Sequence, residues 1–124
     1  MSMNINDFRA TGFDGYLVNA DGDVISIKNK EPKLLNQWER HGYKRVSLWE
    51  NGEKFNVSVH RLVATAFLDN PNGYEEINHK DENKSNNNVN NLEWCTHLYN
   101  INYGTRAKRS AETRKRNNKL RKAV

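Results

Sequence analysis

Parts of the first sixty residues form short β-rich runs or alternate between apolar and polar positions with a period of two, which is the pattern of half-buried β-strands. Two short apolar runs, at residues 16–18 and 24–27, lie on either side of an Asp-Gly turn and predict a hairpin. The pattern returns at residues 43–49 and 55–60, around Asn-Gly, a dipeptide typical of tight hairpin turns. We therefore expect four strands, in one small antiparallel sheet, before residue 60.

A helical spacing of apolar residues follows the strands. Over residues 60–68 the apolar side chains fall on one face of a helix, and the pattern ends before the turn-forming sequence Asn-Pro-Asn-Gly at 70–73. Residues 92–95 have the composition of a short strand. Thr96 is a suitable N-cap for a helix over residues 97–103.

Between these elements, residues 77–96 contain seven asparagines. Such a segment cannot be ordered by hydrophobic packing. Asparagine side chains instead hydrogen-bond to nearby backbone groups and tolerate tight turns. We expect a polar loop whose order depends on something outside it.

Composition limits the class of protein. The chain has 124 residues, of which 35% are hydrophobic, so we expect a small core with extensions. No apolar run approaches the roughly 18 residues needed to cross a bilayer, and the first ten residues lack the apolar stretch of a signal peptide. A single cysteine, Cys95, cannot form an internal disulfide. These features predict a cytoplasmic protein without a membrane partner.

Charge is unevenly distributed along the chain. Residues 105–124 carry nine basic side chains and one acidic one, a net charge of +8, whereas the first 104 residues carry 11 basic and 14 acidic ones, a net charge of −3. A strongly basic segment is typical of nucleic-acid binding, because neutralised phosphates release their counterions. The same run is equally consistent with a solvated tail.

The segment from residue 77 to residue 100 carries the most specific pattern. It reads N-H-K-D-E-N-K-S-N-N over 78–87 and N-L-E-W-C-T over 91–96, followed by Asn100. This pattern resembles the HNH homing endonuclease family, in particular its phage and intron type. The helix sequence V-H-R-L-V-A at 59–64 and the N-terminal hairpin also resemble that family, so the likeness covers roughly residues 12–104.

The resemblance implies an α+β fold that contains a ββα-metal motif, in which two strands and a helix surround one divalent cation. We expect an N-terminal β-hairpin module over residues 1–58, an HNH nuclease motif over 59–104 and a basic C-terminal helical arm over 105–124.

The resemblance also assigns roles to individual residues. Two residues are assigned to the catalytic site: His79 matches the general base, and Asn91 matches the middle asparagine of the motif, which ties the loop together. Asn78 and Asn100 match the ligands of a Mg²⁺ or Mn²⁺ ion. Many relatives have aspartate where this chain has Asn78, and a neutral amide oxygen binds a hard cation more weakly than a carboxylate does. Basic residues in and after the motif are expected to contact DNA: Arg61, Lys84, Arg106, Lys108, Arg109, Arg114, Lys115 and Arg116.

The chemistry of these residues agrees with hydrolysis of DNA. An imidazole can take a proton from water near neutral pH, and a hard cation can neutralise charge on the phosphate. We expect nicking or double-strand cleavage that leaves 5′-phosphate and 3′-hydroxyl ends. A non-cleaving DNA-binding protein with a decayed site, marked by Asn78, is the alternative, and an enzyme acting on RNA is a third. The sequence after residue 104 carries no clear helix-turn-helix. Specificity is then low or supplied by a homodimer.

Overall fold

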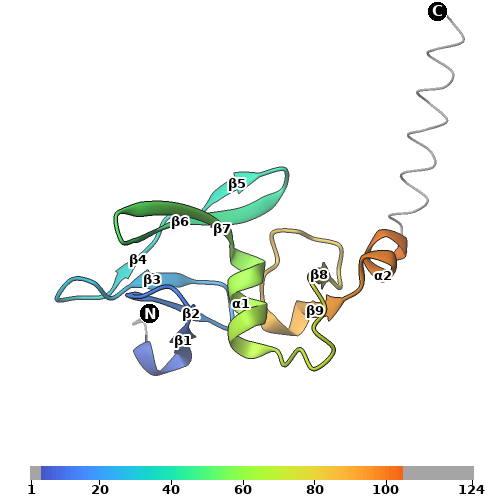
Figure 1. Cartoon of the computed structure of the whole chain (residues 1–124), viewed down its shortest axis with the longest axis horizontal. Coiled ribbons are helices and arrows are strands. Elements are labelled where there is room, and N and C mark those ends of the chain that lie inside the picture. The colour runs from blue at the N-terminus through green and yellow to red at the C-terminus, as the bar shows by residue number, and fades with distance from the viewer. Residues whose placement is uncertain (1–3, 105–124) are drawn as a thin grey trace, which may run out of the picture.

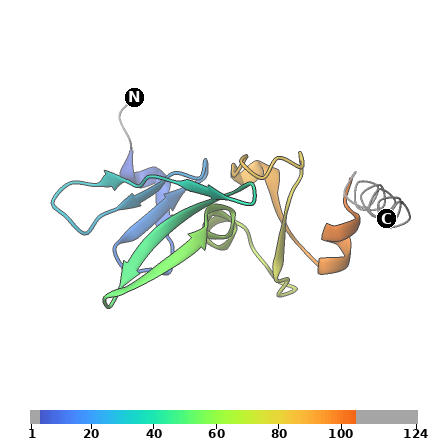
Figure 2. The same cartoon turned by 90° about the horizontal axis from the view of Figure 1, so that it is seen from above.

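The computed structural model describes residues 4–104. Three groups of elements follow one another in space (Figures 1 and 2). Two N-terminal sheets lie at one end, helix α1 (Val59–Phe67) lies in the middle, and a hairpin with a short helix lies at the other end. The predicted basic arm, residues 105–124, lies outside the described residues. None of the helices in residues 4–104 has the length and apolar character that crossing a membrane requires.

The first sheet is antiparallel and has the strand order β1-β2-β3-β4. Its strands, which follow a single 3-10 turn at Ile5–Asp7, are β1 (Phe8–Ala10), β2 (Tyr16–Asn19), β3 (Val24–Ser26) and β4 (Lys33–Leu34). Tyr16, Val18 and Val24 are buried in the main core. The hairpin predicted around the Asp-Gly turn is therefore confirmed, with Tyr16 opposite Ser26.

The second sheet contains β5 (Trp38–Arg40), β6 (Tyr43–Glu50) and β7 (Glu53–Ser58) in that order. The predicted Asn51-Gly52 turn joins β6 to β7, and both of its residues have positive φ angles, 52° and 79°. The prediction of four strands in one sheet before residue 60 was wrong, since the described residues before residue 60 contain seven strands in two sheets. The missed strands β1, β4 and β5 have only two or three residues each, too few to show a period of two.

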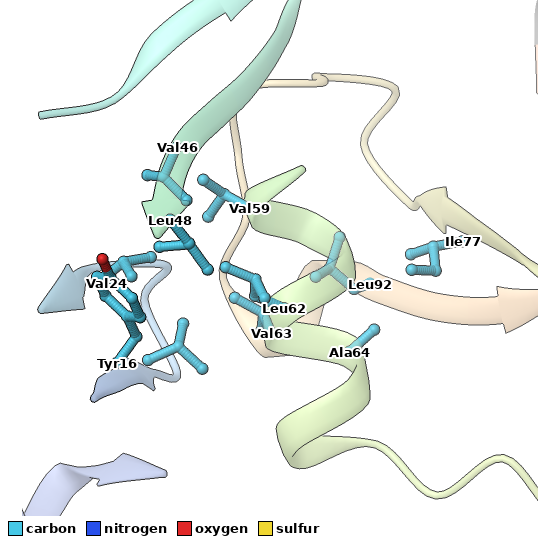
Figure 3. Packing of buried hydrophobic residues seen from close by; sticks show 11 residues of the cluster. Tyr16, Val24, Val46, Leu48, Val59, Leu62, Val63, Ala64, Ile77 and Leu92 are labelled. Atoms are coloured by element: carbon cyan, nitrogen blue, oxygen red, sulfur yellow. The ribbon is translucent and has the colours of Figure 1, made fainter. Parts of the chain in front are cut away.

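Helix α1 packs against both halves of the molecule. Its buried residues are Val59, Leu62, Val63 and Ala64. The helix contacts β2, β6 and β7 on the side of the N-terminal sheets and contacts β8 (Glu76–His79) and β9 (Leu92–Cys95) on the other side. Figure 3 shows side chains from both halves gathered around this helix. A single hydrophobic cluster thus joins the N-terminal strands to the segment that carries the asparagine-rich pattern.

The last group forms a ββα unit. Strands β8 and β9 pair antiparallel, a 3-10 turn at Val89–Asn91 leads into β9, and α2 (His97–Asn102) follows. Thr96 caps α2 as predicted, because its side-chain oxygen accepts a hydrogen bond from the backbone N–H of Tyr99. The α+β architecture with two strands and a helix around residue 78 is therefore present.

The turn between β2 and β3 makes a testable contact with the asparagine-rich loop. Gly22 has a φ of +90°, and a Cβ atom there would lie 3.1 Å from Cβ of Asn87 and 3.3 Å from Cγ1 of Val59. Gly52 has a similar φ of +79°, but a Cβ there would meet nothing within 4 Å. Gly22 therefore carries a steric constraint in addition to a conformational one.

We predict that Gly52→Ala lowers the free energy of unfolding by about 1–2 kcal/mol through backbone strain alone. Gly22→Ala should cost about 1–3 kcal/mol more, because Asn87 must also be displaced. Urea unfolding of the two variants and the parent protein checks this. An equal loss in both variants would show that the turn and the loop are not packed tightly.

Candidate functional site

The two strands of the ββα unit separate the candidate residues onto two faces. In the register of β8 and β9, Asn78 lies opposite Glu93, and His79 lies opposite Leu92. Because successive side chains on a strand point to opposite faces, His79 shares a face with Leu92, and Asn78 shares the other face with Glu93. Helix α2 contacts β8, and its residue Asn100 forms a hydrogen bond with Glu76. Glu76 lies on the same face of β8 as Asn78. The proposed base and the proposed ligand are therefore neighbours in sequence that point in opposite directions.

His79 is held in a buried pocket. Its side chain is only 1% exposed, and its Nε2 lies 2.8 Å from Oδ1 of Asn87, which is buried as well. A carbonyl oxygen can only accept, so Nε2 carries the hydrogen and the lone pair of the neutral ring lies on Nδ1. The rings of His60 and Tyr43 flank that of His79, with centroid separations of 5.1 and 6.2 Å. Asn87 lies within the sequence motif, but the motif alone does not indicate that it contacts His79.

The asparagine-rich loop is ordered by hydrogen bonds, as its composition predicts. Asn91 donates from Nδ2 to Oδ1 of Asp81 and to the backbone oxygen of Asn86, both over 2.9 Å, and accepts from the backbone N–H of Asp81. The side-chain hydrogen bond from Asn86, followed by the backbone N–H of Asn83, lowers the pKa of Asp81. Asn91 thus joins Asp81 and Asn86 within the loop.

Contacts with the first sheet supply the outside support that the loop needs. The backbone N–H of Val89 donates to the carbonyl oxygen of Ala20 over 2.8 Å, and Nδ2 of Asn88 donates to the Asp21 carboxylate over 2.7 Å. Gly22 of the same turn lies against Asn87. The β2–β3 turn therefore positions the loop residue that holds His79.

The opposite face of the strands carries the two predicted ligands beside two carboxylates. Asn78 is fully buried, and its Nδ2 donates to Oε1 of Glu93 over 2.8 Å. Asn100 donates from Nδ2 to Oε1 of Glu76 over 2.9 Å. This hydrogen bond, and then the one with His97, lowers the pKa of Glu76. Sequence reasoning missed both carboxylates, because only the structure shows that a glutamate lies beside each asparagine.

Oδ1 of Asn78 is a buried carbonyl oxygen with no hydrogen-bond partner among residues 4–104. Leaving such a group unpaired costs about 1–3 kcal/mol, which a cation at this position would offset. Amide and carboxylate oxygens are the ligands that Mg²⁺ and Mn²⁺ prefer. Among the described residues, no group of three or more His, Cys, Asp or Glu side chains could hold a metal ion. The buried amide oxygen of Asn78 is of the type that fits a hard divalent cation.

The two described basic residues that were expected to contact DNA also make contacts within the chain. Arg61 donates to the backbone oxygen of Glu75 over 3.0 Å. Lys84 donates to the backbone oxygen of His41 over 3.3 Å, and its ammonium lies 4.6 Å from the centre of the Tyr43 ring. Both side chains are exposed. The remaining expected contacts lie outside the described residues: Arg106, Lys108, Arg109, Arg114, Lys115 and Arg116.

Comparison with known proteins agrees with this geometry, which has the arrangement of a ββα-metal nuclease unit. Residues 57–101 match the family model described as HNH endonuclease. Residues 57–101 are therefore the part of this chain that is similar to the HNH endonuclease family.

Two curated relatives are similar over most of this chain. The DNA endonuclease I-HmuI of Bacillus phage SP01 is 42% identical over 94 residues, which cover 73% of this chain and 52% of the relative. An uncharacterized HNH endonuclease of Acanthamoeba polyphaga mimivirus is 43% identical over 88 residues, covering 71% of this chain and 26% of the relative. The chain thus spans about half of one relative and about a quarter of the other.

A solved structure gives the same result for the fold. The structure entitled "DNA binding and cleavage by the HNH homing endonuclease I-HmuI" has a TM-score of 0.68 and 32% sequence identity to this chain. The match covers 85% of this chain and 66% of that one.

His60 beside the site leads to a pH prediction. Burial, and then the neighbouring His79, lower the pKa of His60 from 6.5 to about 3. Its Nδ1 is buried without a hydrogen-bond partner in the described part of the chain. The folded protein therefore keeps this ring neutral at a pH where the unfolded chain takes up a proton.

The unfolded state binds a proton at His60 that the folded state does not. The contribution of neutral His60 to the free energy of unfolding is therefore fully present above pH 6.5 and is lost as the pH drops from 6.5 toward 3. We expect His60 to contribute a slope of about 1 kcal/mol per pH unit in this window. His60→Gln should remove most of that slope between pH 7 and 5, whereas His41→Gln, at an exposed position, should leave it unchanged. Urea unfolding at several pH values provides the measurement. A slope that survives in His60→Gln would assign the proton uptake to another group.

Proposed function

We propose that the chain is a divalent-metal-dependent endonuclease that hydrolyses DNA phosphodiester bonds, with His79 as the general base. The observation that carries this proposal is the pairing of a fixed histidine with a buried, unpartnered carbonyl oxygen on the adjacent residue, Asn78. The products expected from attack by water on the phosphorus are a 5′-phosphate and a 3′-hydroxyl.

The hydrogen bond between Nε2 of His79 and Asn87 determines which nitrogen acts. Because Nε2 carries a hydrogen, Nδ1 is the atom that takes the proton from the attacking water. The Asn87 oxygen also stabilises the ring once it is positively charged, since the Nε2–H then becomes a stronger donor. At 1% exposure, neighbouring side chains must move before a DNA phosphate can reach the ring.

Asn78 and Asn100 are the residues that would hold a Mg²⁺ or Mn²⁺ ion through their side-chain oxygens. When bound, such an ion supplies charge neutralisation at the phosphate and at the leaving 3′ oxygen. The chain's own contribution is the orientation of the two amides on one face of the unit.

DNA is proposed as the substrate because one relative is named a DNA endonuclease and the matched structure describes DNA binding and cleavage. Arg61, Lys84 and the basic residues after residue 104 are proposed to contact phosphates. The neutral ligand Asn78 favours one alternative, a DNA-binding protein that does not cleave. Incubation with supercoiled plasmid over a range of Mg²⁺ concentrations separates the two functions.

The role of His79 can be tested by substitution. His79→Ala should lower the cleavage rate by about 10²–10⁴-fold, because it removes the proton acceptor. DNA binding should change little, since the ring is buried. His41→Ala, at an exposed histidine, is the control and should retain full activity. Near-normal turnover by a folded His79→Ala variant would refute the assignment.

The role of the basic segment can be tested by truncation. Deleting residues 105–124 should weaken binding to all DNA sequences alike, because phosphate contacts carry little sequence information. The slope of log K against log salt should decrease by about 0.9 for each phosphate that the shortened protein no longer neutralises. Affinity measured over a salt series for both proteins gives the answer. An unchanged slope would show that these residues do not bind DNA.

A further inference from the structure

Each candidate amide ligand is held by its own carboxylate. The NH₂ group of Asn78 donates to Glu93, and the NH₂ group of Asn100 donates to Glu76. Glu93 lies directly opposite Asn78 in the register of β8 and β9. The arrangement is therefore repeated, with one carboxylate behind each asparagine.

A carboxylate fixes the direction of an amide. An asparagine can rotate so that its oxygen and nitrogen exchange places, but an ionised carboxylate only accepts hydrogen bonds and therefore selects the NH₂ side. For Asn78 the result is visible, because the oxygen at the other end of the amide is buried without a donor among residues 4–104. The Glu93 carboxylate accepts a hydrogen bond from the amide nitrogen of Asn78, so the amide oxygen points away from Glu93.

Glu93 also connects β9 to α2. A side-chain hydrogen bond with Glu93 raises the pKa of the Tyr99 hydroxyl, and Tyr99 precedes Asn100 on α2. The carboxylate accepts a hydrogen bond from Asn78 on β8, and Tyr99 on α2 lies near enough for Glu93 to affect its pKa. A fixed carboxylate can hold an amide in one orientation, whereas a mobile one cannot.

We propose that Glu93 and Glu76 are positioning residues that convert two neutral asparagines into a cation site. They orient the amide oxygens toward the ion, and their two negative charges replace the charge that an aspartate at position 78 would bring. This inference rests on the proposed function only in its choice of Asn78 and Asn100 as ligands. It assigns neither glutamate as a direct ligand.

The test is Mn²⁺ binding to the full chain, measured by the loss of the free-Mn²⁺ electron paramagnetic resonance signal. Four proteins form a cycle: the parent, Glu93→Ala, Asn78→Asp and the double variant. In the parent background Glu93→Ala should weaken binding by about 10–100-fold, the range for loss of a group that orients a metal ligand. Glu53→Ala, at an exposed position in β7, is the control and should not change the affinity.

In the Asn78→Asp background the effect of removing Glu93 should be much smaller. An aspartate has two equivalent oxygens and brings its own charge, so position 78 no longer needs an acceptor that selects the NH₂ side of an amide. The same reduction is expected for Glu76→Ala in an Asn100→Asp background. Glu93→Gln, which keeps an acceptor but loses the charge, should bind between the parent and Glu93→Ala, and it supports the test if the alanine variant does not fold.

Three results would overturn the proposal. If Glu93→Ala weakens binding equally in both backgrounds, Glu93 is a direct ligand. If it lowers the free energy of unfolding without changing Mn²⁺ affinity, Glu93 is only structural. If the parent protein binds no Mn²⁺, the cation site does not exist. Both this inference and the proposed metal-dependent cleavage are then refuted. Mn²⁺ binding with the smaller effect in the Asn78→Asp background, but without DNA cleavage, would instead refute the proposed function and leave this inference intact.

Discussion

The packing of α1 between two groups of strands is the constraint on which the rest of the structure depends. Val59, Leu62, Val63 and Ala64 are buried between N-terminal strands on one side and the β8–β9 hairpin on the other. A two-stranded hairpin with one short helix cannot bury enough apolar surface to be stable alone. The ββα unit, which carries the candidate chemistry, is therefore ordered because it shares the core of the preceding sheets.

A second connection extends that shared core to the polar loop. The loop closes on itself through Asp81 and Asn91, and it docks on the β2–β3 turn through Asn88 and Val89. Asparagine can fill both roles because its amide donates and accepts, and because it tolerates tight turns. The first sheet thus positions the loop, and the loop residue Asn87 in turn holds His79 through a hydrogen bond.

Much of the fold could be predicted from local patterns. The two hairpins, α1 and the cap at Thr96 each depend on turn chemistry, periodicity or a capping side chain within a few residues. The strands β1, β4 and β5 could not, because two or three residues carry no period. At the site, the resemblance to the HNH family identified Asn78 and His79 as candidates. It could not identify Glu93 or Asn87 as their partners, because strand register and loop docking join residues eight to fifteen positions apart.

The alternation along β8 has a consequence for the tolerance of the chain to insertions. Asn78 and His79 occupy opposite faces because they are adjacent, and every side chain of the strand depends on that count. A residue gained or lost between Glu76 and His79 would exchange the two faces, and the amide would turn toward α1. The exposed turn at Asn51 and Gly52, by contrast, can change length while the faces of β8 stay as they are. Natural variation in length should therefore be concentrated in the turns of the N-terminal sheets and be absent from this four-residue strand.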